Sequence, residues 1–141
     1  MKKIELLLQE KEHTCTCAVA RMILQLKDIH LSEMEIEKQM KVDPIVGASA
    51  QQLMNFLKGN GIESELIVNS SIEVLKNDNS LKLLLFNLFG RISHVAIIDR
   101  ILCDGLTLLD PATGKTHSKF SKLSNQWEAD GIKKGFIKVK I

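Results

Sequence analysis

Apolar residues along this chain follow a helical spacing in the first part and form strand-like runs in the second. From Cys15 to Leu26 they recur every three or four positions, so that they share one face of a helix whose other face is polar. This pattern predicts a helix over about residues 15–27, with Cys15 at its N-terminus. Thr14 is the expected N-cap, whose hydroxyl would bond a free N–H group of the first turn.

Capping signals and turn residues predict three more helices. Ser32 and Glu35 have the sequence of a capping box, in which each side chain bonds the backbone N–H of the other residue. Two glycines and one asparagine at 59–61 end a helical run in a typical C-terminal turn. The predicted helices start at Ser32 and run to about Met40, cover 48–57 with a cap near Gly47 or Ser49, and cover 71–75 briefly.

The second part of the chain is rich in Ile, Leu and Val between turn signals, which is typical of strands. Cys103, Asp104 and Gly105 have the composition of a hairpin turn. Helices followed by an antiparallel sheet predict an α+β fold, as a single domain over 1–141 with a helical lobe at about 9–61 and a sheet lobe at about 62–141. The expected strands are 63–68, 81–89, 93–101, 105–109 and 135–141, and residues 4–8 form a short strand or a lead-in segment.

Composition narrows the classes of function. The chain is 45% hydrophobic and 26% charged with a net charge of +2, and its charges are interspersed, so an ordinary globular domain is expected. Five Phe, one Trp and no Tyr offer no stacking platform, which argues against a nucleic-acid partner. The apolar run 83–89 is too short to span a bilayer and no signal peptide is visible, so we expect a cytoplasmic protein. Three cysteines, an odd number, argue against a disulfide framework.

The predicted start of the first helix carries candidate chemistry. A helix N-terminus favours an anion, and the thiolate is the nucleophilic form of cysteine, so Cys15 is a candidate nucleophile. Gln9 lies six residues earlier, and its side-chain amide could donate to the oxygen of a tetrahedral intermediate together with the Cys15 N–H group. A histidine and an acid would complete a catalytic site.

His94 and Asp110 are the candidates for these two roles. His94 begins one predicted strand and Asp110 ends the next, with the predicted turn at Asp104 about midway between them. Pairing of the two strands in a hairpin therefore brings His94 and Asp110 together. A carboxylate that accepts from one imidazole nitrogen leaves the other nitrogen to face a thiol.

In this order and spacing, the chain resembles the papain-like double-glycine leader peptidases, best known as N-terminal peptidase domains of bacteriocin-exporting ABC transporters. Thr14 and Thr16 stand where that family usually has Asp and Gly. The resemblance rests on Gln9 six residues before Cys15, Met22 seven residues after it, a Gly47-x-Ser49-x3-Leu53 helix closed near Gly61, a His94-Val-Ala-Ile strand and an Asp110-Pro-x-x-Gly-Lys turn.

The resemblance implies a papain-like cysteine peptidase, here as a stand-alone domain although members are often fused to a transporter. Cys15 would be the nucleophile, His94 the general base and acid, Asp110 the residue that orients His94, and Gln9 the oxyanion donor. The implied substrate is a leader peptide, bound extended in the groove and cleaved after a Gly-Gly pair. No metal or cofactor is required.

Alternative interpretations remain open from the sequence. The same triad would serve a secreted effector or toxin domain that acts on another protein as a protease, deamidase or acyltransferase. A non-catalytic peptide-binding member of the fold is a second alternative. His13, Cys15 and Cys17, completed by Cys103 or His117, form a weaker metal-binding alternative, because Cys-x-Cys is tighter than the usual zinc spacing. Cys17 lies about 200° around the helix from Cys15, so we expect it to point away from the core. Trp127 is expected to anchor the core.

Overall fold

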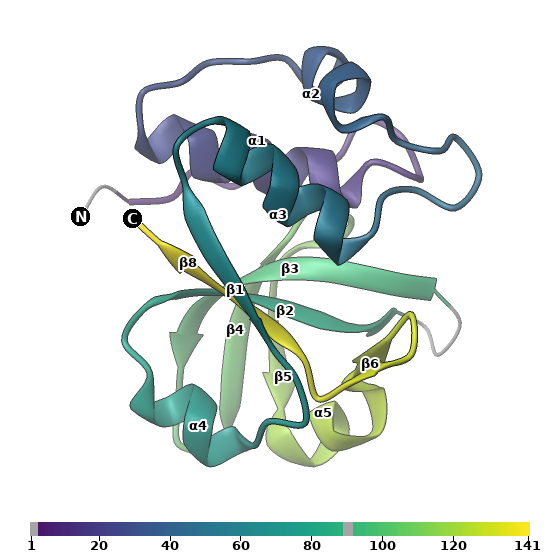
Figure 1. The fold of residues 1–141 in the computed structure, drawn as a ribbon. Helices are drawn as coiled ribbons and strands as arrows, with labels where there is room; N and C mark the ends of the chain where they lie inside the picture. The colour runs from purple at the N-terminus through teal and green to yellow at the C-terminus, as the bar shows by residue number, and fades with distance from the viewer. Residues whose placement is uncertain (1–2, 89–91) are drawn as a thin grey trace.

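An antiparallel sheet of six strands, in the order β1-β8-β2-β3-β4-β5, forms the centre of the molecule. The structure is a computed structural model and describes residues 3–88 and 92–141. Figure 1 shows α1, α2 and α3 on one side of this sheet and α4 and α5 on the other. The elements are α1 (Cys15–Leu26), α2 (Glu33–Met40), α3 (Ala50–Gly59), β1 (Glu63–Ile67), α4 (Ile72–Asn77), β2 (Leu81–Leu88), β3 (Ile92–Ile101), β4 (Gly105–Asp110), β5 (Gly114–Lys119), α5 (Phe120–Gln126), β6 (Glu128–Ala129), β7 (Ile132–Lys133) and β8 (Phe136–Lys140).

The two central strands supply both hydrophobic cores. Successive side chains of a strand point to opposite faces, so an unbroken apolar run fills the space on each side of the sheet. On β2, Leu83 and Leu85 pack in the core beneath α1 to α3, whereas Leu84 and Phe86 pack in the core with Leu75 of α4 and Leu123 of α5. Trp127 is buried in this second core, as the sequence predicted.

The predicted helix caps at the start of α2 and α3 are confirmed. The hydroxyl of Ser32 accepts from the N–H of Glu35, and the hydroxyl of Ser49 accepts from the N–H of Gln52, each at 3.1 Å. The Glu35 and Gln52 side chains return the bond to the cap residue, so both helices begin with a complete capping box.

The structure decides one open alternative and corrects other parts of the sequence prediction. The segment before Gln9 has no regular secondary structure, so it is a lead-in rather than a strand. The predicted turn at 110–115 is found at residues 111–113, but a further strand, β5, follows it from Gly114. This strand was not predicted, because its sequence is mostly polar and lacks the apolar pattern of a strand. Helix α5 and the hairpin of β6 and β7 were also not predicted. The expected end of β2 at Phe89 lies outside the described residues.

A β-bulge on β3 sets the register that matters most for the site. Near the hairpin turn Arg100 pairs with Thr107, but one step further Ile98 pairs with Leu108, so Asp99 is an extra residue on β3. A one-residue shift reverses which side chains share a face. With this bulge the register from Ile98 onward places Asp110 on the same face as His94.

The capping box of α3 provides a test of how local sequence contributes to stability. We expect Ser49→Ala to lower the free energy of unfolding by about 1 kcal/mol, because it removes the acceptor for a first-turn N–H group. Ser49→Asn keeps an acceptor and should remain close to wild type. Urea denaturation of the three proteins measures this; equal stability of the alanine and wild-type proteins would contradict the capping role.

Candidate active site

A buried hydrogen bond joins the two residues that the hairpin brings together. His94 Nε2 lies 2.6 Å from Asp110 Oδ1, and both side chains are almost fully buried. His94 is the third residue of β3 and Asp110 is the last residue of β4. The structure therefore places His94 and Asp110 side by side, as the sequence predicted.

Surrounding groups hold both members of the pair in place. The Phe86 ring, opposite His94 on β2, contacts the imidazole edge-on with the ring centres 5.4 Å apart. Asp110 Oδ1 also accepts from the N–H of Ala112 at 2.8 Å. Burial acts to raise the pKa of Asp110, but the hydrogen bond and charge of His94, followed by bonds from Ala112 and Thr113, hold that pKa below its usual value. Asp110 is therefore a carboxylate at neutral pH.

Cys15 approaches the same imidazole from the N-terminus of α1. Burial acts to lower the pKa of His94, but hydrogen bonds with Asp110 and Cys15 and the charges of both groups raise that pKa to about 9. Because Nε2 is bonded to Asp110, Nδ1 is the nitrogen left for the thiol. A thiol, an imidazole and a carboxylate thus lie close together, with Cys15 and His94 lining one pocket and Asp110 bonded to His94.

A narrow pocket opens beside the thiol. Its volume is about 30 Å³, and its walls come from the start of α1, the start of α3, strands β2 and β3, and the β6-β7 hairpin. A cavity of about 10–15 Å³ on this measure holds one water molecule, so the pocket has room for only a small group. The lining residues are Cys15, Thr16, Ala48, Ala50, Leu53, Leu85, Ser93, His94, Val95, Ala129, Asp130 and Ile132.

Gln9 is tied to the site through its backbone and to its own loop through its side chain. The Gln9 N–H donates to the Pro111 carbonyl at 2.7 Å, next to Asp110. Its Nε2 donates to the carbonyls of Lys11 at 2.7 Å and Glu12 at 3.0 Å. Both amide hydrogens are thus engaged, so an oxyanion role requires one of these bonds to be released or shared on substrate binding.

Comparison with known proteins places the chain in a family. The family model described as "Peptidase C39 family" matches residues 3–132, most of the chain. The chain belongs to the peptidase C39 family. No curated protein matches it by sequence.

Solved structures confirm that the C39 chain has the α+β fold of this family. A double glycine motif protease from an AMS/PCAT transporter, solved with the leader peptide, matches with a TM-score of 0.81 at 16% identity, over 98% of this chain and 91% of that one. The peptidase domain of Streptococcus ComA, a bi-functional ABC transporter involved in quorum sensing, matches with a TM-score of 0.79 at 15% identity. The match covers 97% of this chain and 98% of that one. The peptidase domain of Streptococcus mutans ComA matches with a TM-score of 0.73 at 15% identity, over 96% of this chain and 98% of that one.

The prediction that Thr14 caps the helix of Cys15 through its hydroxyl is wrong. Thr14 does occupy the N-cap position of α1, but its side chain makes no capping bond. Its Oγ1 instead donates to the Lys11 carbonyl at 2.9 Å and accepts from the Lys11 N–H at 3.1 Å. The hydroxyl closes the loop that carries Gln9, and it leaves the first-turn N–H groups beside Cys15 without a side-chain cap.

The prediction that Cys17 points away from the core is also wrong. Cys17 is fully buried in the core shared by α1 and its neighbours, because α1 is covered by α2 on the side that faces away from the sheet. Burial, followed by the charges of Glu33 and Glu37 on α2, raises the pKa of the Cys17 thiol to about 12. Cys17 is therefore a protonated core residue, whereas Cys15 is half-buried at the pocket.

The residues of the metal alternative are used in other ways. His13 Nε2 pairs with Glu37 Oε1 at 3.0 Å, and Lys11 Nζ pairs with the other oxygen of Glu37 at 3.2 Å. Over residues 3–88 and 92–141, no three potential ligand side chains gather as a metal site. In the same part of the chain, no helix has both the length and the apolar composition to cross a bilayer.

The raised pKa of His94 predicts how protonation affects the fold. We expect the His94 ring to titrate near pH 9 instead of near the usual 6.5. The protonated ring then stabilises the fold fully below about pH 6.5, and this contribution is lost as the pH rises through about 9.

Nuclear magnetic resonance of the labelled imidazole measures this midpoint directly. In Asp110→Asn, which keeps the shape and removes the charge, the midpoint should fall and the alkaline loss of stability should shrink. A midpoint near pH 6.5 in both proteins would rule out the proposed coupling of His94 to Asp110.

Proposed function

We propose that this C39 family member is a cysteine peptidase that uses Cys15, His94 and Asp110 as its catalytic triad. The observation that supports this most strongly is the buried 2.6 Å bond between His94 and Asp110, which leaves Nδ1 for the thiol. Cys15 and Asp110 both favour the protonated ring, so His94 is suited to accept the proton of the thiol.

The mechanism follows from these positions. The Cys15 thiolate attacks the peptide carbonyl carbon, and the negative charge that forms on the oxygen is bound by the N–H of Cys15 and the amide of Gln9. The His94 imidazolium gives its proton to the leaving amine, which breaks the C–N bond and leaves a thioester. His94 then removes a proton from water, and the resulting hydroxide releases the acid and frees the thiol.

The pocket supports a substrate with a small residue next to the scissile bond. A volume of about 30 Å³ beside Cys15 accommodates glycine and excludes long side chains. We therefore propose an extended peptide substrate that is cleaved after Gly-Gly, as in a leader peptide. One structural neighbour was solved as a double glycine motif protease with the leader peptide bound, which agrees with this proposal. We expect the enzyme to act in the cytoplasm.

Cleavage of a peptide library tests the proposed chemistry. We expect Cys15→Ala and His94→Ala to lower cleavage of Gly-Gly peptides by roughly 10³-fold or more, because each removes a member of the triad. Cys103→Ser, at an exposed cysteine in the hairpin turn, is the matched control and should keep full activity. Mass spectrometry of the products measures both cleavage and deamidation.

The same samples separate the alternatives. Cleavage that persists in Cys15→Ala would remove Cys15 from the mechanism. A mass gain of one unit on glutamine without cleavage would indicate a deamidase. No reaction, with iodoacetamide labelling of Cys15 no faster than that of free cysteine, would indicate a peptide-binding protein.

Gln9 has either a chemical or a positioning role, and two rates distinguish them. If its amide binds the oxyanion, Gln9→Ala should lower kcat by about 10²-fold. Alkylation of Cys15 by iodoacetamide forms no oxyanion, so its rate should remain unchanged. If alkylation falls together with kcat, Gln9 acts only by holding the loop of residues 10–13 and the turn after Asp110.

A further inference from the structure

One wall of the pocket carries a charge that the catalytic triad does not use. Strands β6 and β7 form a small hairpin, and three of its residues, Ala129, Asp130 and Ile132, line the pocket together with Cys15. Of the side chains that line this pocket, Asp130 is the one carboxylate, and His94 is the other titratable group besides the thiol. Asp130 is therefore an acidic residue at the wall of the pocket.

The Asp130 backbone is held firmly at this place. Asp130 and Gly131 both have positive φ, of 51° and 79°, which is the conformation of a two-residue hairpin turn that favours Asn-Gly and Asp-Gly. The Asp130 N–H donates to Ser93 Oγ at 2.9 Å, directly beside His94 in the sequence. The turn is thus fixed to the strand that carries the catalytic imidazole.

The base of the hairpin is equally constrained. Buried Trp127 Nε1 donates to the Gly135 carbonyl at 2.8 Å, and the Lys134 N–H donates to the Trp127 carbonyl at 2.9 Å. A Cβ atom at Gly135 would lie 2.4 Å from the Ile132 side chain, so glycine is what allows this close approach. The hairpin is therefore a packed wall of the pocket.

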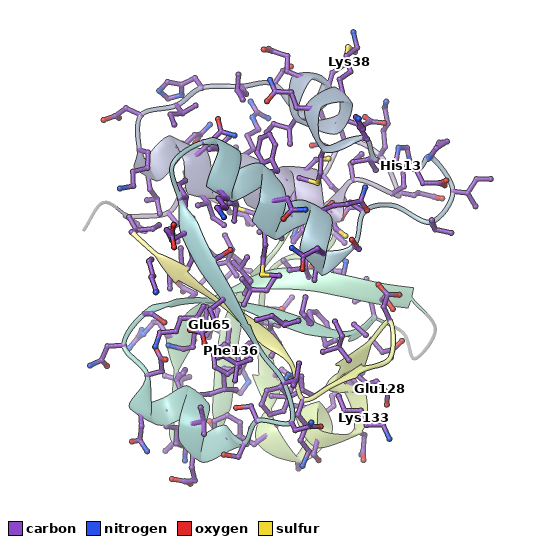
Figure 2. The ribbon with its side chains drawn as sticks, in the orientation of Figure 1. His13, Lys38, Glu65, Glu128, Lys133 and Phe136 are labelled. Carbon is purple, nitrogen blue, oxygen red and sulfur yellow. The ribbon has the colours of Figure 1, made fainter. Side chains whose placement is uncertain are left out.

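The Asp130 carboxylate itself is available to a ligand. The residue is exposed, and no ion pair joins its carboxylate to another residue within 3–88 or 92–141. Glu128 and Lys133 face each other across the two strands, and Figure 2 labels both on this hairpin. Glu128 is acidic like Asp130 but does not line the pocket. It therefore offers a control for the charge of the hairpin.

We propose that Asp130 is a specificity-determining residue that favours a basic side chain, Lys or Arg, in the substrate. Asparagine would suit this turn as well as aspartate does. The turn therefore does not explain why the residue is charged. The pocket is too small for a Lys or Arg side chain. The basic group would therefore belong to the residue before the small Gly-Gly pair and lie across the exposed mouth. This substrate preference rests on the proposed peptidase function.

Charged thiol reagents test the charge without any peptide substrate. Two methanethiosulfonates, one with a trimethylammonium group and one with a sulfonate, each transfer an alkylthio group to a thiolate and release methanesulfinate. In a Cys103→Ser background, Cys15 is the accessible thiol, because Cys17 is fully buried. Asp130 should favour the cationic reagent, so Asp130→Asn should lower the ratio of cationic to anionic rates about fivefold.

Asp130→Asn keeps the preferred turn residue, and Glu128→Gln is the matched charge control on the same hairpin. Glu128→Gln should change the rate ratio by less than about twofold, since Glu128 does not line the pocket. An unchanged ratio in Asp130→Asn, or an equal fall in both variants, would overturn the assignment. This test needs only a reactive Cys15, so its outcome is independent of peptidase activity.

Paired peptides test the substrate class. Acetylated Gly-Gly peptides with lysine or its uncharged analogue norleucine before the pair should differ about fivefold in kcat/KM with wild type and be equal with Asp130→Asn. Equal cleavage of both by wild type would overturn the proposed preference while leaving the peptidase proposal intact. No cleavage of either peptide, with the reagent effect present, would refute the peptidase proposal and leave the charge assignment standing.

Discussion

The hydrogen bond between His94 and Asp110 is the interaction on which the proposed site depends. A buried imidazolium or carboxylate alone would be costly, and each group offsets that cost for the other. The pair also fixes which ring nitrogen faces Cys15. Since the two residues come from neighbouring strands, the sheet must place them with the accuracy of one residue, and the bulge at Asp99 does this.

The rest of the fold supports this placement from two sides. The alternating side chains of β2 and β3 fill one core under α1 and another beside α4 and α5, so the strand that carries the imidazole and its neighbour are packed on both faces. Helix α1 is itself buried between the sheet and α2, which fixes the position of its N-terminus. The Gln9 backbone then joins the loop before α1 to the turn after Asp110.

Features that depend on nearby residues could be predicted from the sequence, and features that depend on distant contacts could not. The capping boxes at Ser32 and Ser49 follow from local spacing. Hairpin geometry predicted that His94 and Asp110 are neighbours, but not the bulge at Asp99 that puts both side chains on one face. The burial of Cys17 depends on α2, which no pattern in α1 reveals. The Asp130-Gly131 dipeptide was the one available signal for the β6-β7 hairpin.

The positions of Cys15 and Cys17 also have a consequence for oxidative damage. Neighbouring cysteines often protect one another, since a sulfenic acid on the first is captured as a disulfide by the second. Here the two side chains leave helix α1 in different directions, and the second thiol is sealed in the core in its unreactive protonated form. A sulfenic acid at Cys15 therefore has no resolving thiol on its own helix, and its reduction requires a thiol from outside this helix.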